Sequence, residues 1–296
     1  MSTQTYRPIA RRRRPSFGRW VAQVGWKYPF AALVIAYAIF PLLYVLSTSV
    51  SQLGTLTGST TLFSSFSTKS YEAVLETSFV DWALNTLVIG AATALGTVLM
   101  AASAAYVFSR YDFKGRRTAL TTLLVVQMFP QMLAFISIYL LLYSLGNVVP
   151  ILGLDSALAL ICVYLGGALG ANTFLIYGFF NTVPREIDEA AKIDGASHAQ
   201  IYWRIILRLV TPILVVVAVL SFMAAFGDFI LARIILVQES NWTLAVGMYA
   251  WVSDQLNANW GMFAAGAVIA ATPILLMFVF LQRYIVGGLT SGALKG

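Results

Sequence analysis

Two charged side chains, Asp228 and Arg233, stand inside a long apolar run in the last third of the chain. An ionised group inside a membrane span is costly, so residues of this kind are functional candidates by default. The two lie five residues apart and do not share a helix face, so no direct ion pair is expected. We predict that Asp228 lies on a translocation path or at an interface with another membrane subunit. Arg233 is expected to reach outward to the membrane surface.

Uncharged polar residues in other apolar runs are weaker signals. A solute path could be lined by Gln127, Gln131, Asn172 and Thr173, but hydrogen bonding between helices is the role that we favour for them. The only histidine, His198, falls in a polar loop, and the only cysteine, Cys162, falls in an apolar run where we expect a small packing residue. A membrane-embedded enzyme needs convergent acid, base or metal groups, so neither a metal site nor a catalytic centre is predicted.

The composition indicates that a bilayer surrounds these residues. Of 296 residues, 59% are hydrophobic and 10% are charged, and the mean hydropathy is +0.80. A transmembrane helix needs roughly 20 mainly apolar residues. Six segments meet this requirement, which predicts an all-α integral membrane protein with six transmembrane helices: 30–50, 83–108, 118–145, 156–183, 209–236 and 260–282. Small residues crowd 90–96 and 166–171, so these two stretches are expected to pack closely against other helices.

The distribution of Lys and Arg predicts the orientation. With the N-terminus in the cytoplasm and the segments alternating, 17 of the 19 Lys and Arg residues fall on the cytoplasmic side. Both termini are therefore predicted to be cytoplasmic, in agreement with the positive-inside rule. The basic arm 1–29 also resembles the start of a secretory signal, but we expect the first helix to be retained. The domains expected are this arm, a membrane domain over 30–288 and a cytoplasmic tail over 289–296.

The cytoplasmic loop 181–209 carries the most specific pattern. Pro184 suits the first turn of a helix, in which Arg185 and Glu189 have the spacing of an ion pair. Asp194 and Gly195 predict a turn, and Ser197 with Gln200 matches a capping box at the start of a second helix. The second helix would direct Ile201, Ile205 and Ile206 toward the fifth span. From spacing alone, this loop could be a projecting pair of helices that docks on a partner, or a re-entrant loop at the membrane interface.

This loop resembles the EAA signature of ATP-binding-cassette (ABC) importer permeases, which implies a type I ABC importer permease fold. The residues that carry the resemblance are Glu189, Ala190, Ala191, Asp194, Gly195, Ala196, Ile205 and Leu207. In that family the loop inserts into a cleft of the ATPase subunit, as a helix in a groove. Glu189 would face a basic residue of the ATPase there. Arg208 stands where the family usually has proline.

Further segments are similar to the smaller permease subunit of maltose-type sugar importers, among them 127–130, 164–167, 243–248 and 288–296. The resemblance implies a heterodimer with a second permease subunit, two ATPase subunits that use ATP and Mg, and an extracytoplasmic sugar-binding protein in the bacterial cytoplasmic membrane. The external loop 237–259 would contact the binding protein through Asn241, Trp251, Asn257 and Asn259. The tail would contact the ATPase through Ser291, Gly292, Lys295 and Gly296.

Several alternatives remain open. The permease could carry maltose or maltodextrin, or else trehalose or another oligosaccharide. An ion-coupled secondary transporter is the rival of a different class, although such carriers usually need intramembrane charges and often have repeated halves. The chain contains no phosphate-binding G-x-x-x-x-G-K-[ST] loop, so no nucleotide cofactor is expected on it and no enzymatic activity is predicted for it. Membrane lipid is an expected partner, and nucleic acid is not.

Overall fold

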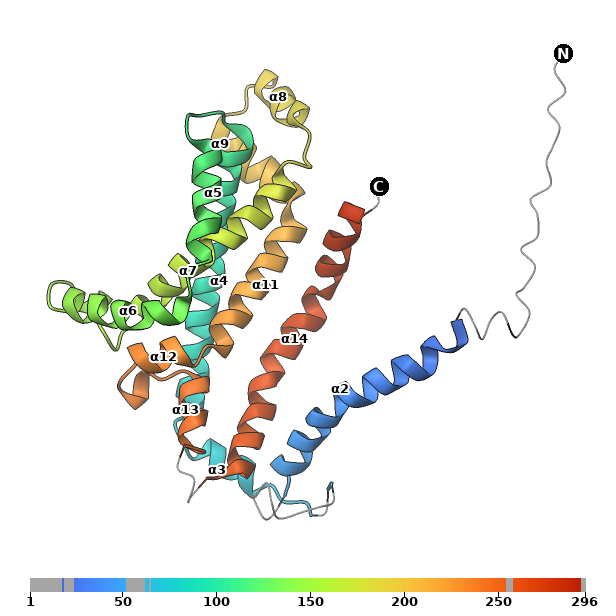
Figure 1. Ribbon diagram of the computed structural model, residues 1–296, viewed down its shortest axis with the longest axis vertical. Coiled ribbons are helices and arrows are strands. Elements are labelled where there is room, and N and C mark those ends of the chain that lie inside the picture. Colours follow the sequence, from blue (N-terminus) through green and yellow to red (C-terminus); the bar gives the residue numbers. More distant parts are fainter. Residues whose placement is uncertain (1–17, 19–23, 52–61, 64, 254–257, 294–296) are drawn as a thin grey trace.

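The computed structural model describes residues 18, 24–51, 62–63, 65–253 and 258–293, with the backbone alone from 283 onward. Within these residues every regular element is helical (Figure 1). The longer helices are α2 (Lys27–Ser49), α4 (Phe79–Arg110), α5 (Arg116–Gln127), α6 (Gln131–Gly146), α7 (Ala157–Phe180), α11 (Thr211–Gly227) and α14 (Trp260–Ala293). The shorter ones are α3 (Lys69–Leu75), α8 (Arg185–Ile193), α9 (His198–Gln200), α10 (Leu207–Leu209), α12 (Ile230–Ile235) and α13 (Leu244–Ala250), with single turns at η2 (Pro150–Leu152) and η4 (Glu239–Asn241) and a π-helical segment, η3 (Ile201–Ile206).

Among the described residues, four unbroken helices are long and apolar enough to cross a membrane: Lys27–Ser49, Phe79–Arg110, Ala157–Phe180 and Trp260–Gln282. Two bent pairs also pass when each is taken as one span. They are Arg116–Gln127 with Gln131–Gly146, and His198–Leu209 with Thr211–Gly227. The structure therefore has four to six candidate spans, and the all-helical prediction is confirmed.

The third predicted span is not the continuous helix expected over 118–145. The chain bends by 93° between α5 and α6, so that α6 lies nearly crosswise to α5 (Figure 1). Pro130 precedes α6 with an extended backbone, φ −62° and ψ 110°. Proline has no N–H to donate and disfavours a helical residue before it, which accounts for a break here. Pro41 and Pro273, by contrast, lie inside continuous helices.

The fifth predicted span, 209–236, is also divided. A 78° bend separates the segment that ends at Leu209 from α11. The helix α11 then ends at Gly227, and Asp228 is extended, with φ −71° and ψ 124°. The short helix α12 follows. The polar residue that stood out in the sequence therefore lies at a break in the apolar segment and not inside a helix.

The centre of the fold is α4, which packs most extensively against α7 and α11. Small residues allow this close approach, as predicted. A Cβ atom on Gly96 of α4 would lie 2.8 Å from the Leu165 side chain of α7. A similar close approach joins α7 to α5, where a Cβ atom on Gly170 would lie 2.7 Å from the Leu123 carbonyl oxygen. Cys162 departs from expectation: it is exposed on α7 and is not a buried packing residue.

The helix α2 lies at the edge of the fold and packs mainly against α14 (Figure 1). Its buried residues are confined to its last turn, at Ser47, Thr48 and Ser49. A helix that is apolar all round and exposed along its length requires lipid or another membrane subunit around it. Figure 1 also shows α8 at one end of the long axis and α3 at the other.

Candidate functional site

The loop 181–209 folds as a helical hairpin at one end of the molecule. Its first arm is α8, which begins after Pro184, as predicted. Gly195 has φ +82°, in the left-handed region that glycine adopts without strain. Ser197 accepts a hydrogen bond from the Gln200 N–H, and the Gln200 side chain accepts one from the Ser197 N–H. The turn and the capping box predicted from the sequence are therefore confirmed.

The second arm continues through α9, the π-helical segment and α10. Ile201 and Ile206 are fully buried in a cluster formed with α4, α7 and α11, and Ile205 packs against that cluster. The Tyr202 hydroxyl lies 3.0 Å from the Ser103 hydroxyl of α4. The predicted direction of the isoleucines is thus confirmed. Arg208, at the position of the family proline, is exposed within α10.

A buried ion pair, not predicted from the sequence, holds the first arm against α4. Arg110 Nε lies 2.5 Å from Asp188 Oδ2, and their side chains are 7% and 10% exposed. The guanidinium also donates to the carbonyl oxygens of Phe180 and Val183, at 3.2 and 3.1 Å. The expected Arg185–Glu189 ion pair does not form, because Arg185 donates instead to the Ser109 carbonyl oxygen, at 3.0 Å. One guanidinium therefore ties the end of α7 and the hairpin to α4.

Asp188 and Ala191 form the buried side of α8, and the opposite side is free. Glu189, Ala190 and Ile193 are exposed, and Ile193 is 88% exposed. Asp194 and Gly195 are exposed and Ala196 is half-buried. Lys192 is exposed on the same helix, so the free side of α8 combines small and apolar side chains with charges of both signs. Such a surface can enter a groove on another protein.

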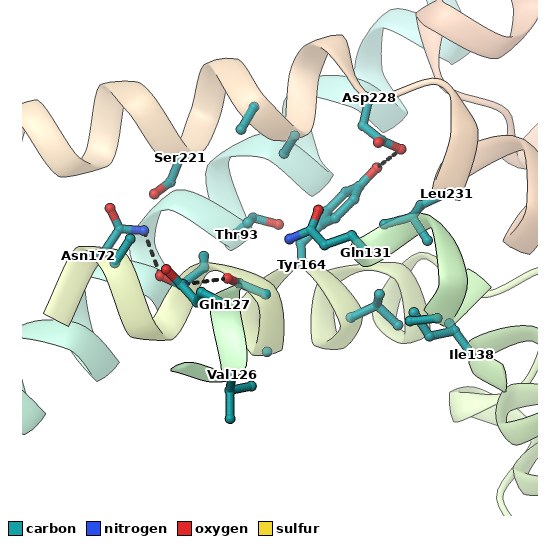
Figure 2. A pocket seen from close by; sticks show the side chains of 18 of the residues that line it. Thr93, Val126, Gln127, Gln131, Ile138, Tyr164, Asn172, Ser221, Asp228 and Leu231 are labelled. Carbon is teal, nitrogen blue, oxygen red and sulfur yellow. Dashed lines mark hydrogen bonds between the residues drawn. The ribbon is translucent and has the colours of Figure 1, made fainter. Parts of the chain in front are cut away.

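The second candidate site is a cavity of about 500 Å³ among α4, α5, α6, α7, α11 and the break before α12 (Figure 2). Of the five residues that the sequence suggested for a path, four line the cavity: Gln127, Gln131, Asn172 and Asp228. Thr173 is fully buried and does not line it. The structure therefore brings the four together from four separate segments. The Gln127 amide donates to the Gly167 carbonyl oxygen at 3.2 Å, and the Asn172 amide donates to the Ala168 carbonyl oxygen at 2.7 Å.

Asp228 has two hydrogen-bond donors on one carboxylate oxygen. The Tyr164 hydroxyl donates to Oδ1 at 2.9 Å (Figure 2). The Ala232 N–H donates to the same atom at 3.0 Å. The carboxylate thus caps α12 and joins it to α7. Arg233 takes no part in this contact: its guanidinium lies over the Trp242 ring, 5.3 Å from the centroid.

Three cavity-lining residues carry polar groups that sequence reasoning did not single out: Thr93, Tyr164 and Ser221. Tyr164 belongs to the segment 164–167 that resembles sugar permeases, but hydroxyl residues are frequent in these helices and the sequence did not indicate which of them face a cavity. Only the joint position of α4, α7 and α11 brings these hydroxyls to one space.

The loop 237–259 lies at the other end of the molecule. Asn241 donates to the Asp155 carboxylate at 2.9 Å, and Trp251 stacks on Phe79 with the ring centroids 6.2 Å apart. The Asn259 side chain accepts the Met262 N–H at 3.0 Å, in the first turn of α14. These three residues thus help to hold the loop in place. Asn257 lies outside the described residues.

The predicted tail contacts are described only in part. The backbone at Ser291 and Gly292 continues α14, toward the same end of the molecule as α8 (Figure 1). Lys295 and Gly296 lie outside the described residues.

Comparison with known proteins gives consistent results. The maltodextrin transport system permease protein MdxG of Bacillus subtilis is 40% identical over 271 residues, which cover 91% of this chain and 95% of that protein. The galactooligosaccharides transport system permease protein GanQ of the same organism is 40% identical over 218 residues, which cover 74% of this chain and 75% of GanQ.

A solved structure has the same fold. It is a chain of a bacterial ABC transporter involved in the import of the acidic polysaccharide alginate, with a TM-score of 0.75 and 22% sequence identity. The match covers 92% of this chain and 100% of that chain. Residues 97–290 match the family described as binding-protein-dependent transport system inner membrane component. With this match and relatives at 40% identity over most of their length, the chain belongs to that family of bacterial inner-membrane transport proteins.

Proposed function

We propose that this chain is the membrane permease subunit of an ABC importer that carries neutral oligosaccharides of the maltodextrin type. The observation that carries the proposal is the hairpin at 181–209. Glu189 and Ala190 of the EAA pattern lie on its free face, and Ala191 lies on the side that is packed against the rest of the fold. The Arg110–Asp188 pair anchors this arm. The family and the 40% identity to a maltodextrin permease support the class of transport and the class of sugar. Trehalose and galactooligosaccharides are the alternative cargoes.

The proposed topology has six spans, with each bent pair counted as one, and both termini in the cytoplasm. The concentration of Lys and Arg in alternate loops supports this orientation. The hairpin and the end of α14 then lie on the cytoplasmic side, and the loop 237–259 lies outside.

The importer would comprise this chain, a second permease subunit, two ATPase subunits and an extracytoplasmic sugar-binding protein. The ATPase subunits would bind ATP and Mg and carry out hydrolysis, and this chain would have no catalytic role. The exposed, lipid-length α2 and the free face of α8 support the need for partners in the membrane and beneath it. Asn241, Trp251, Asn257 and Asn259 stay our candidates for contact with the binding protein. Ser291, Gly292, Lys295 and Gly296 stay those for contact with the ATPase.

Coupling would be mechanical. Closure of the ATPase dimer would displace the groove that holds α8, and the rigid hairpin would transmit the displacement to the spans. The Arg110–Asp188 pair supports this role because it joins α8 directly to α4, the helix at the centre of the fold. Gln127, Asn172 and Asp228 would line the path that opens and closes.

Reconstitution of the full complex in vesicles tests the proposal. Transport should require ATP and stop with vanadate, and it should persist when an uncoupler removes the ion gradient. A cross-linker attached at Ala196 or Ser197 should capture the ATPase subunit, since both residues lie at the turn of the hairpin. Uptake that follows the ion gradient and ignores vanadate would identify a secondary transporter instead. A panel of maltodextrins, galactooligosaccharides and trehalose would then identify the cargo.

A further inference from the structure

We propose that this chain itself holds the sugar in transit: the cavity lined by α4, α7 and the two bent spans is a binding subsite for one neutral glycosyl unit. This inference rests on the proposed function and adds that the permease partner does not hold the sugar alone. A cavity of about 500 Å³ falls within the range of small-molecule sites.

Glycines create the room in this cavity. Gly166 lines it, and a Cβ atom added there would have no neighbour within 4 Å. Elsewhere on the same helix, Gly170 is in tight contact with Leu123 and Gln127. The glycines of α7 thus serve two purposes. One allows helices to meet, whereas Gly166 leaves an open space where any side chain would project.

Two buried hydroxyl groups at the cavity have no hydrogen-bond partner among the described residues. Thr93 is 2% exposed and Ser221 is 6% exposed. The comparison with Thr86, on the same helix as Thr93, is informative. Its hydroxyl bonds to the Trp82 carbonyl oxygen at 2.7 Å, one turn back, so a threonine on α4 can satisfy itself locally. An unsatisfied buried hydroxyl costs free energy. Both hydroxyls belong to residues in the cavity wall but have almost no accessible surface of their own. Rotation of either side chain toward the cavity would let a sugar hydroxyl supply the missing partner.

The charge of the lining selects the class of ligand. Asp228 is the only acidic side chain among the described lining residues, and neither Lys nor Arg is among them. Its Oδ1 is taken by Tyr164 and Ala232, and Oδ2 has no hydrogen bond within the described part of the chain. Oδ2 can accept hydrogen bonds from sugar hydroxyls, but it would repel a uronate carboxylate. The site therefore fits a neutral sugar.

The rest of the lining suits a sugar ring. Amide side chains at Gln127 and Gln131 can both donate and accept hydrogen bonds, as hydroxyl groups require. Phe129 and Phe135 present apolar surface for the C–H face of the ring. Figure 2 labels Thr93, Gln131 and Tyr164 among the residues that line the cavity.

Filling the cavity is the first test. Gly166→Phe projects a ring into the open space, and Gly178→Phe is the matched control on the same helix, since Gly178 also has free space at Cβ but does not line the cavity. In the reconstituted complex we expect Gly166→Phe to abolish sugar transport while the binding protein still stimulates ATP hydrolysis, and Gly178→Phe to transport normally. Normal transport by Gly166→Phe would overturn the proposal.

The second test measures directly whether sugar occupies the cavity. It does not require the Gly166→Phe variant to assemble into the complex. Gly166→Cys is introduced together with Cys162→Ser, and the rate of thiol labelling is measured in the vanadate-trapped complex. A neutral maltodextrin should slow labelling and an oligouronate should not. Ser221→Ala should raise the maltodextrin concentration that halves the labelling rate by about fivefold, which is the effect of losing one hydrogen bond. Labelling that is insensitive to maltodextrin, or equally sensitive to the oligouronate, would refute the subsite.

The unmodified complex separates this inference from the proposed function. If it shows no ATP-dependent sugar transport, the proposed function fails and the subsite fails with it. If it transports sugar and sugar never protects the thiol at position 166, the importer assignment stands and only the proposed subsite is wrong.

Discussion

Replacing Asp188 with asparagine removes the charge that faces Arg110 and keeps the size of the side chain. Both partners are at least nine-tenths buried, so the pair is shielded from water and salt. Breaking a buried ion pair from one side costs about 3–5 kcal/mol, because the remaining charge is stranded. Here the guanidinium retains the carbonyl oxygens of Phe180 and Val183. We therefore expect a smaller loss of about 2–3 kcal/mol.

This loss should appear as local opening of the hairpin. A change of about 2–3 kcal/mol corresponds to about a 30- to 150-fold shift in the opening equilibrium of α8. Amide hydrogen exchange in α8 should accelerate by that factor, while the centre of α4 should keep its protection. In vesicles, Asp188→Asn should hydrolyse ATP with little transport, because the ATPase would move an arm that is no longer fixed to α4.

The control is Asp112→Asn, which breaks the exposed i,i+4 pair with Arg116. The Asp112 side chain is 76% exposed and that of Arg116 is 24% exposed. Such surface pairs contribute about 0.3–0.5 kcal/mol, so exchange should change by about twofold at most. If Asp188→Asn leaves exchange in α8 unchanged, or if both variants lose transport equally, the ion pair does not fix the hairpin.

Three further outcomes concern the hairpin. Gly195→Pro should insert in the membrane and assemble but stop transport, because proline cannot adopt φ +82°; uptake at the normal rate would count against the rigid turn. Glu189→Lys reverses an exposed charge, so co-purification of the ATPase should fall while thermal stability stays unchanged. Ser197→Ala removes half of the capping box and should destabilise the second arm by about 1 kcal/mol, measured as faster exchange at its start.

The sequence was informative wherever the signal was local. The capping box at Ser197, the positive φ at Gly195 and the start of α8 each depend on a few consecutive residues. The close approach at Gly96 also followed from a run of small residues. Gln127, Asn172 and Asp228 were selected as polar residues in apolar segments. Their meeting at one cavity depends on how the segments pack.

Features that depend on long-range packing were missed. Arg110 lies at the end of α4 and Asp188 lies in α8, and the residues that flank each in the sequence do not indicate that the two form a pair. The prolines illustrate the same limit. Pro41 and Pro273 sit inside helices and Pro130 begins one after a sharp bend, although all three lie in similar apolar surroundings. The packing of neighbouring helices decides whether a proline breaks a span.

The unbroken course of α4 has one more consequence. Thr93 at the cavity and Arg110 at the hairpin belong to this same helix of 32 residues, and about 25 Å of axis separates them at 1.5 Å per residue. A rod of that length that tilts by about 10° moves one end by about 4 Å relative to the other. A small tilt of α4 at the hairpin would thus shift the wall of the cavity at Thr93 by more than the diameter of a water molecule, without bending any helix.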